Sequence, residues 1–491
     1  MISIFFTTLG VAALYLYHVN AAMKRVPDEA HKSSPHRWTV DEVKAAYKKI
    51  LENPIDITDS LPPKQSRRYI VVGGSGLVGG WIVSHLLARG EDPASLRILD
   101  LLSPTQDILD LGVTFIKTNI TDELAVSTAF EQPWPTTVAN QPLTVFHTAA
   151  VIRAFERLEI YLPLCTKVNI DGTRNVLNAS KKSGATCFIS TSSGSVTLHK
   201  PGFWIAPWET LPRRVMQILS DDAKLPERHD EFFGNYAVSK IAAERLVRSA
   251  DDPAAGFRTG CIRPANGIYG IGSDASATIT GLYLRSGGSP TWVRPVIQSF
   301  VNAENVSLAH LLYEARLLEQ SNPKNKTTLP NTGGQSFVVT DPNPAISFND
   351  VYTLLSTLSK TPVSFPTVQP LPFLLLSYLV EGYAYVQAAL LPWLLPKVTG
   401  DLLQIQPSLF AITDVFCIAD DERARRGPEE GGLGYRPVIT TLDGMCKQLV
   451  DWNAKADAKR VAEIKGKVDG GSVSVGKDGV DVKIVVPEKT L

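Results

Sequence analysis

A glycine-rich segment between an apolar strand and a helix constrains the fold of this chain more than any other feature. The run Tyr69–Val72 predicts a buried strand, and Trp81–Ala88 predicts a helix. Between them, Gly73, Gly76 and Gly79 recur at every third position. They would permit, in that order, a tight turn, the approach of phosphates, and close packing of the helix. Glycine is common in any turn, but a strand that turns directly into a helix points free N–H groups at a ligand, so this context predicts a pyrophosphate site.

The next predicted strand, Leu96–Asp100, ends in an acid. A ribose hydroxyl of a bound dinucleotide needs an acceptor about 20 residues beyond the glycines. The charge of Asp100 would repel a 2′-phosphate, and no arginine follows it directly, so this position favours NAD over NADP. Arg97 lies nearby, which leaves NADP open as the alternative.

Length and composition narrow the remaining classes. The 491 residues allow more than one domain and a large core. Lys and Arg number 49, as do Asp and Glu, so the basic excess typical of a nucleic-acid partner is absent and we expect no such partner. The five cysteines are far apart and form no CxxC pair, which predicts no metal site and no disulfide framework. We expect them to be small buried residues in a reducing compartment.

The N-terminus, residues 1–23, predicts a transmembrane anchor. Met1–Val19 contains no charged residue, and Lys24 and Arg25 follow it. No basic residue precedes the apolar run, as one would in a cleavable signal peptide, which is the alternative. Because the positive charges follow the run, we expect the rest of the chain in the cytosol.

Four Asn-X-Ser/Thr sequons offer a check on this topology. They begin at Asn119, Asn178, Asn305 and Asn325. If the body of the protein is cytosolic, none of them should carry glycan.

Residues 24–66 are predicted to connect the anchor to the body. Thr39 and Glu42 form a capping box ahead of a predicted helix over Val43–Leu51. We interpret this helix as a spacer, with a membrane-surface helix as the alternative.

Strands and helices alternate from residue 67 to residue 270, which predicts an α/β Rossmann fold with a doubly wound parallel sheet. The further strands are predicted at Val113–Thr118, Leu143–His147, Cys187–Ser190 and Phe257–Ile262, and the later helices at Thr166–Lys182 and Tyr236–Ser249. Ligands of such sheets bind at the carboxyl ends of the strands, where the polar clusters of this region fall.

The alternation loosens beyond residue 270. Residues 271–452 are predicted to form a smaller C-terminal substrate-binding region, within which 371–396 is apolar. Because Pro372, Glu381, Gln387 and Pro392 interrupt this segment, we expect it to dip into one leaflet rather than span the membrane. A pair of core helices is the alternative. The tail, 453–491, is charged and then alternates over Ser472–Val486, which predicts a small hairpin.

Tyr236 and Lys240 place a phenol and an ammonium four residues apart on one helix face. A nearby cation lowers the pKa of a phenol, and such a tyrosine can accept or return the proton of an alcohol. The pair is common in helices, but here it follows a strand that ends in Thr191–Ser193. A serine hydroxyl there can bind the same substrate oxygen, so the arrangement predicts hydride-transfer chemistry beside a nicotinamide.

Several segments together resemble a known family. They are, in chain order, Gly73–Gly79, Val145–Ala150, Val168–Val176, Ser190–Ser193, Tyr236–Lys240, Arg263–Gly270, Phe300–Val306, Phe337–Asp341 and Leu433–Pro437. With them the chain resembles an extended short-chain dehydrogenase/reductase over residues 67–452. Within that superfamily it is similar to the 3β-hydroxysteroid dehydrogenase/isomerase group, which includes the sterol-4α-carboxylate 3-dehydrogenases.

The resemblance implies a role for each catalytic position. Tyr236 would be the acid/base, and Lys240 would lower its pKa and hold the nicotinamide ribose. Ser193 would orient the substrate oxygen, with Ser192 as the rival for that role. Asn169 would support the proton relay, unless it is a capping or packing residue.

The resemblance also implies a cofactor site. It would comprise Gly73, Ser75, Gly76, Leu77, Val78, Gly79, Asp100, Asn119, Ile120, Ala149, Ala150, Ser192, Tyr236, Lys240, Pro264 and Asn266. Within this set Asp100 would bind the adenosine ribose, Asn119 and Ile120 would flank the adenine, and Pro264 to Asn266 would contact the nicotinamide amide.

The implied function is the NAD(P)-dependent oxidation of the 3β-hydroxyl of a sterol or triterpenoid, with loss of CO2 if the substrate carries a 4α-carboxylate. The implied location is the endoplasmic reticulum membrane, with the catalytic domain facing the cytosol and a homodimer as the expected assembly. The alternative enzyme is an NADPH-dependent carbonyl reductase of a secondary metabolite. A nucleotide-sensing protein without catalysis is disfavoured, because Ser193, Tyr236 and Lys240 are all intact.

The segment between Ser193 and Tyr236 departs from the family pattern. It contains five aromatic residues, namely Phe203, Trp204, Trp208, Phe232 and Phe233. We expect this segment to cap a flat apolar substrate, although aromatic residues are also ordinary core.

Overall fold

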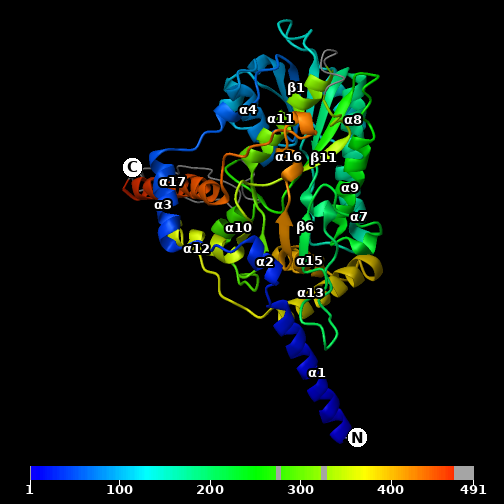
Figure 1. Ribbon diagram of the computed structural model, residues 1–491, viewed down its shortest axis with the longest axis vertical. Helices are drawn as coiled ribbons and strands as arrows, with labels where there is room; N and C mark the ends of the chain where they lie inside the picture. The colour runs from blue at the N-terminus through cyan, green and yellow to red at the C-terminus, as the bar shows by residue number, and fades with distance from the viewer. Residues whose placement is uncertain (1, 273–277, 322–328, 469–491) are drawn as a thin grey trace, which may run out of the picture.

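The computed structural model describes residues 2–272, 278–321 and 329–468 (Figure 1). A helix, α1 (Ile2–Met23), projects from a body built around one large sheet. The hairpin predicted over Ser472–Val486 lies outside the described residues.

The large sheet has seven strands, all paired in parallel, in the order β11-β7-β5-β4-β1-β2-β3. The strands are β1 (Arg68–Val72), β2 (Leu96–Asp100), β3 (Thr114–Lys117), β4 (Leu143–His147), β5 (Ala185–Thr191), β7 (Arg258–Pro264) and β11 (Gln335–Val339). The chain runs outward from β1 to β3 and then returns to β4 on the other side of β1. The predicted doubly wound fold is therefore confirmed, and its topological switch point lies between β1 and β4.

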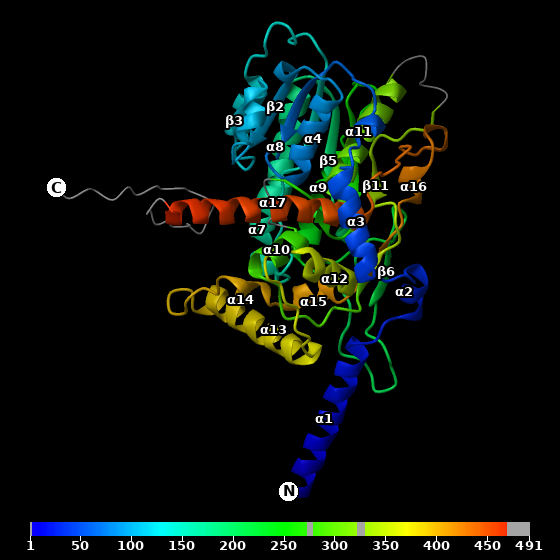
Figure 2. The same ribbon diagram turned by 90° about the vertical axis from the view of Figure 1, so that its left-hand side faces the viewer.

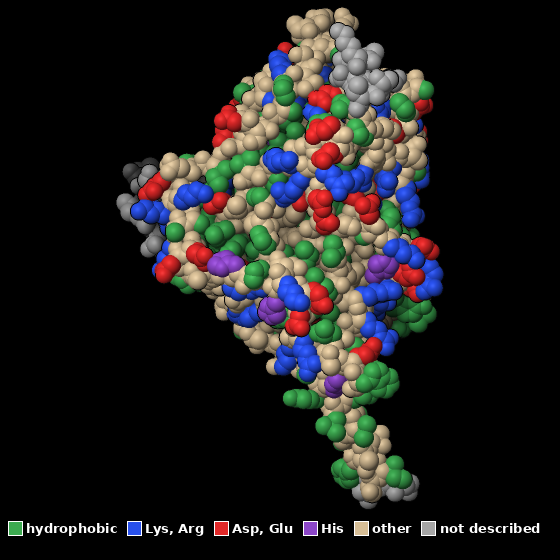
Figure 3. Space-filling view, viewed as in Figure 1, with side chains coloured by type: hydrophobic (Ala, Val, Ile, Leu, Met, Phe, Trp, Pro, Cys, Tyr) green, Lys and Arg blue, Asp and Glu red, His purple; other side chains and the backbone are tan. Residues whose placement is uncertain are grey.

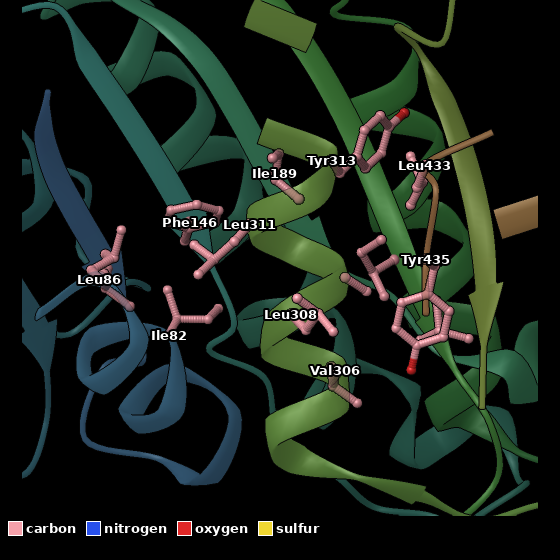
Figure 4. Packing of buried hydrophobic residues seen from close by; sticks show 14 of the residues in the cluster. Ile82, Leu86, Phe146, Ile189, Val306, Leu308, Leu311, Tyr313, Leu433 and Tyr435 are labelled. Carbon is pink, nitrogen blue, oxygen red and sulfur yellow. The ribbon is translucent and has the colours of Figure 1, made fainter. Parts of the chain in front are cut away.

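Helices cover both faces of this sheet. On one face lie α4 (Leu77–Ala88) and α11 (Ala303–Ser321), and Figure 4 shows Ile82 and Leu308 among the side chains of these helices that pack toward the sheet. The other face is covered by α6 (Glu123–Glu131), α8 (Thr173–Lys182) and α9 (Asn235–Arg248). Both β11 and α11 come from beyond residue 270, so the sheet and its covering layer extend past the predicted boundary.

The helix predicted from Thr166 begins earlier than expected. It starts with α7 (Leu162–Thr166), continues through a π-helical turn (Lys167–Gly172) and ends with α8. Pro163 lies in the first turn, where its missing N–H needs no intrahelical partner, so a proline there begins a helix rather than breaking it.

A second sheet of four strands joins distant parts of the chain. Its order is β12 (Ile346–Ser347), β9 (Ile297–Gln298), β13 (Phe416–Ala419) and β6 (Met216–Leu219). A further strand pair joins β8 (Ile268–Tyr269) to β10 (Val301–Asn302). Because β6 belongs to the segment between Ser193 and Tyr236, that segment is partly built into the C-terminal region rather than forming a free cap.

The connector after the anchor is part of the folded body. The predicted helix is present as α3 (Val40–Glu52), with the capping box of Thr39 and Glu42. However, α3 packs against α12 (Phe348–Leu358) and α17 (Thr441–Val468), and Val43 and Ile50 are buried there. The interpretation as a spacer is therefore wrong: Val43, Ala46, Tyr47 and Ile50 form an apolar stripe at helical spacing that a helix can bury.

Two helices are long and apolar enough to cross a membrane by length and composition. One is α1, whose projecting part in Figure 3 carries hydrophobic and uncharged side chains. The other is α13 (Pro370–Tyr385) with the π-helical turn Val386–Leu390 that follows it. All five cysteines lie in the described part of the chain, and each is buried with a free thiol, as expected.

Candidate functional site

A cavity of about 530 Å³ lies at the carboxyl ends of β1, β4, β5 and β7. Its wall includes most residues predicted for the cofactor or for catalysis: Gly73, Gly76, Leu77, Val78, Gly79, Asp100, Asn119, Ile120, Ala149, Ala150, Ser192, Ser193, Tyr236, Lys240, Pro264 and Asn266. Two predicted residues, Ser75 and Asn169, are described but lie outside this wall. The fold thus brings residues from nearly two hundred positions of sequence to one cavity at the switch point.

The glycine turn leaves no room for side chains where the chain passes the sheet. Gly73 has a φ of +84°, and a Cβ there would lie 2.6 Å from both the Ala149 nitrogen and the Thr148 Oγ1. A Cβ on Gly79 would overlap the carbonyl oxygen of Gly73. By contrast, a Cβ on Gly76 would meet only that carbonyl, at 3.3 Å, so the side of Gly76 that faces the cavity is open. This cradle fits a phosphate group at the N-terminus of α4.

Asp100 is held at the end of β2 by backbone N–H groups. Its Oδ2 accepts from the Ser75 nitrogen at 3.1 Å, and its Oδ1 accepts from the Leu101 nitrogen at 2.6 Å. Arg97 points elsewhere: it is buried, donates to carbonyl oxygens that include that of Ala129, and stacks over the ring of Trp134 at 4.0 Å. The Arg97 guanidinium, which was the reason to keep NADP as an alternative, is therefore bound by these groups and does not line the cavity.

The two rival serines have different partners. Ser192 Oγ donates to Glu244 Oε2 at 2.6 Å, so its proton is committed to that carboxylate. Ser193 Oγ lies 2.8 Å from Ser195 Oγ and lines the cavity together with Tyr236. The hydroxyl that is bonded to a carboxylate is thus that of Ser192 and not that of Ser193.

The pKa of Tyr236 differs from the expectation that Lys240 lowers it. Burial raises the pKa of Tyr236 to about 12, and the hydrogen bond with Ser193 offsets only part of this rise. Lys240 Nζ instead donates to the Thr191 carbonyl oxygen at 2.7 Å, and burial lowers the pKa of Lys240 to about 8. Burial therefore dominates the pKa of the Tyr236 phenol.

Asn169 has the contacts of a packing residue. Its amide accepts from the Val151 nitrogen at 2.8 Å, and its Nδ2 donates to the Val151 carbonyl at 3.0 Å and to Ser239 Oγ at 2.9 Å. It lies in the π-helical turn Lys167–Gly172 and is buried. Its side chain therefore fastens the segment after β4 to α9, the helix that carries Tyr236.

A buried ionic cluster joins β7 to α9. Arg263 of β7 donates from Nε to Glu244 Oε2 at 2.9 Å and from Nη2 to Glu244 Oε1 at 2.6 Å. Glu244 belongs to α9, and it also accepts from Ser192 at the end of β5. Burial tends to raise the pKa of Glu244, but Arg263 outweighs this and holds the pKa below its ordinary value of 4.5. The sequence motifs include Arg263 only as part of the segment Arg263–Gly270, and nothing in them points to Glu244.

The rest of the cavity wall is mixed and comes from scattered segments. It has hydroxyl groups, such as that of Ser195, beside the apolar side chains of Ile152, Ala154, Ile268, Ile279 and Ile412. The five aromatic residues between Ser193 and Tyr236 are all described, and none of them lines the cavity. Phe232 and Phe233 are instead buried in a separate core with Val415, so the expectation of an aromatic cap was wrong. Apart from Ile268, these wall residues lie in no recognisable motif, which is why sequence reasoning missed them.

Comparisons with known proteins agree with this architecture. Residues 70–366 match the profile of the "3-beta hydroxysteroid dehydrogenase/isomerase family". The chain is 28% identical over 403 residues to human 3 beta-hydroxysteroid dehydrogenase type 7, covering 78% of this chain and 94% of that protein. It is 26% identical over 387 residues to human sterol-4-alpha-carboxylate 3-dehydrogenase, decarboxylating, covering 78% of this chain and 87% of that protein.

Solved structures extend the likeness of the fold. A UDP-glucose-4-epimerase from Stenotrophomonas maltophila superposes with a TM-score of 0.52 at 15% identity, covering 80% of this chain and 99% of the epimerase. That likeness concerns the fold alone, whereas the profile match covers more than half of the chain, including the glycine turn, Ser193, Tyr236 and Lys240. The chain therefore belongs to the 3-beta hydroxysteroid dehydrogenase/isomerase family.

Proposed function

We propose that this protein is a membrane-anchored, NAD-dependent oxidoreductase that oxidises the 3β-hydroxyl of a sterol or triterpenoid. One observation carries the proposal: Tyr236 and Ser193 line the same cavity as a glycine cradle and several isoleucine side chains. The names of the two human relatives, both dehydrogenases of this chemical class, support the choice of reaction.

The wall of the cavity fits a dinucleotide in three places. The N-terminus of α4 would hold the pyrophosphate, Asp100 would accept from the adenosine ribose, and Pro264 to Asn266 would contact the nicotinamide amide. When bound, NAD supplies the hydride acceptor. Because Arg97 is turned away and Asp100 carries a negative charge, we propose NAD rather than NADP as the cofactor.

The chain's own residues would manage the proton. Ser193 and Tyr236 would both bind the substrate hydroxyl, and Tyr236 would accept its proton as the hydride leaves the carbinol carbon. Lys240, held by the Thr191 carbonyl, would keep a positive charge near this site. Asn169 would act as a positioning residue, because its side chain contacts the backbone of Val151 and not the cavity.

The residues of the cavity wall also indicate whether the substrate is charged. Over residues 2–272, 278–321 and 329–468, Lys240 is the sole Lys or Arg of the cavity wall, and its ammonium is already bound to Thr191. These residues therefore provide no separate cation for a carboxylate at C4. The apolar isoleucine wall is better suited to an uncharged sterol, so we propose simple oxidation ahead of oxidation with loss of CO2.

The test uses the full-length protein in detergent with NAD and two substrates, a 3β-hydroxysterol and its 4α-carboxy derivative. NADH formation and CO2 release are followed together, with Tyr236→Phe as the control. NADH from both substrates, lost in the variant, would support the proposal, and CO2 from the second would add decarboxylation. Absence of NADH with bound cofactor still detectable would refute it and favour a reductase of secondary-metabolite carbonyls with NADPH.

Cofactor preference should depend on Asp100. We expect Asp100→Ser to lower the preference for NAD over NADP by about 10- to 100-fold, because a hydrogen bond to a charged group contributes about 1.5–3 kcal/mol. Values of kcat/KM with the two cofactors measure this directly. Asp110→Ser is the matched control, since Asp110 is an acid on the neighbouring helix α5 (Gln106–Asp110) outside the cavity wall. An unchanged ratio in Asp100→Ser would contradict the assignment.

We propose that the protein resides in the endoplasmic reticulum membrane with its body in the cytosol. Asn119 and Asn178 are exposed, so a lumenal body would present them to glycosylation, whereas Asn305 is buried and less informative. We expect endoglycosidase treatment of the membrane-expressed protein to cause no shift in mobility. A sequon fused ahead of Met1 should become glycosylated and serves as the control. A shift that disappears in Asn119→Gln or Asn178→Gln would overturn this topology.

A further inference from the structure

Helix α13 is buried on one side and carries large apolar side chains on the other. The buried side is mixed: Leu374 and Val380 are buried there beside Glu381. On the outer side, Leu379 is 71% exposed, and Trp393 just beyond the helix is 80% exposed. A helix at an aqueous surface usually turns polar and charged residues outward. The outer side of α13 is therefore suited to contact with lipid.

The location of α13 agrees with such a contact. It lies across the base of the body, next to the point where α1 projects (Figure 2). The end of α1 is fastened to it: Asn20 Nδ2 donates to Gln369 Oε1 at 2.9 Å, and the Leu371 nitrogen donates to Asn20 Oδ1 at 3.2 Å. If α1 crosses a bilayer, α13 lies at its surface, in the geometry of an interfacial helix.

Aromatic side chains surround the junction of the two helices. Tyr15 of α1 stacks on Trp204 with ring centroids 6.5 Å apart, and Trp204 Nε1 donates to the Tyr378 hydroxyl of α13 at 3.3 Å. Trp208 is exposed nearby in sequence. Tryptophan and tyrosine concentrate at the interface between lipid and water, so this group marks the level of the bilayer surface.

The same helix is tied to the segment that follows β4. Arg157 donates from Nε and Nη2 to the two carboxylate oxygens of Glu381, each at 2.8 Å. Tyr161 donates from its hydroxyl to the Ala384 carbonyl oxygen at 2.7 Å. A bidentate pair with little exposure holds its partners in one orientation. The segment 150–161 is therefore positioned by α13.

That segment also forms the mouth of the cavity. Ile152 lines the cavity and is 64% exposed, so it lies where the cavity opens. Ile160 and Leu164, farther along the chain, are also exposed apolar residues. Ile160 directly precedes Tyr161, which is bonded to the end of α13. Exposed apolar side chains therefore occur both at the cavity opening and beside the contact with α13.

We propose that residues 371–396 rest in the bilayer surface and that the substrate reaches the cavity directly from the lipid, past residues 150–161. The proposal rests on the proposed function, since it concerns how a membrane-dissolved alcohol reaches Tyr236. Direct entry from the lipid avoids transfer of the substrate into water. That transfer is unfavourable because it exposes the apolar area of the substrate.

The test compares two substrates in the full-length protein reconstituted in phosphatidylcholine vesicles. One is a 3β-hydroxysterol dissolved in the vesicle, and the other is a 3β-hydroxysteroid without a side chain, dissolved in water below its solubility limit. The variant Leu379→Asp with Trp393→Asp should lower kcat/KM for the vesicle-borne sterol by about tenfold or more, because carboxylates are expelled from lipid. Its kcat/KM for the dissolved steroid should stay within about twofold, since surface substitutions rarely disturb a distant site.

Leu124→Asp is the matched control, because Leu124 is equally exposed but lies on α6, which covers the large sheet. It should leave both substrates unaffected. Equal loss on both substrates in the α13 variant, or no loss on either, would overturn the proposal. Failure of the parent protein to oxidise either substrate would instead refute the proposed function.

A second measurement does not depend on turnover. Brominated phosphatidylcholine should quench part of the tryptophan fluorescence of the parent protein, and Trp393→Phe should lose a share of that quenching. Unchanged quenching in Trp393→Phe would show that this segment lies outside the lipid and would overturn the proposal even if the enzyme is active.

Discussion

Tyr236→Phe is expected to lower kcat/KM for alcohol oxidation by about 10²–10⁴-fold, the usual contribution of a positioned acid or base. The substitution removes a single oxygen from a partly buried ring, so it deletes the proposed proton acceptor but keeps the packing. The loss should fall on kcat, because the cofactor cradle and the apolar wall are unchanged. Cofactor binding, measured by the fluorescence of bound NADH, should persist.

The pH profile gives a sharper readout for this variant than activity alone. Burial raises the pKa of Tyr236 to about 12, so the phenol is protonated at neutral pH. Oxidation needs the deprotonated form, and kcat/KM should therefore rise with pH over the neutral and alkaline range. Tyr236→Phe should lose this rise together with the activity. Tyr47→Phe, on α3 and distant from the cavity wall, is the control, and full turnover by Tyr236→Phe would refute the assignment.

Much of the fold and most of the cavity wall could be predicted because their signals are local. The glycines follow β1 and Asp100 ends β2, and parallel strands bring such ends together. The Tyr236–Lys240 pair is recognisable by its spacing on one helix, α9. A motif gives residue types at fixed spacing. It therefore locates residues whose role lies in the backbone, such as Gly73 in the tight turn.

The predictions that differ from the structure concern properties that depend on residues far away in the sequence. The pKa of Tyr236 is set by burial, which spacing along a helix does not reveal. Similarly, α3 was interpreted as a spacer because its partners α12 and α17 lie about 300 or more positions away. The apolar wall of the cavity draws Ile152 and Ile412 from segments without a motif, and only the folded chain shows that they meet.

Glu244→Gln is expected to lower the free energy of unfolding by about 3–5 kcal/mol, the usual cost of removing one partner of a buried ion pair. The side chains of Glu244 and Arg263 are both inaccessible to solvent, and glutamine has nearly the shape of glutamate. The substitution therefore leaves a packed site in which the Arg263 guanidinium has lost its bidentate carboxylate. Chemical denaturation at neutral pH measures the change.

The stability lost in Glu244→Gln should become smaller as the pH falls. Arg263 holds the pKa of Glu244 below its ordinary value of 4.5, so the carboxylate stabilises the folded state fully above that value and less as the pH falls through the folded pKa. The stability difference between the parent and Glu244→Gln should thus be constant near neutrality and narrow in acid. Glu131→Gln, which breaks the exposed pair with Lys182, should change neither the stability nor its pH dependence measurably.

The same variant separates positioning from chemistry. Glu244 joins α9, which carries Tyr236, to β7, which ends at Pro264, and to Ser192 at the end of β5. Glu244 touches neither substrate nor cofactor in the proposed arrangement. Glu244→Gln should therefore lower kcat/KM by displacing these elements. The rise of activity with pH, which we assign to Tyr236, should persist in this variant. A variant that remained as stable as the parent would contradict the view that this buried pair holds α9 against the sheet.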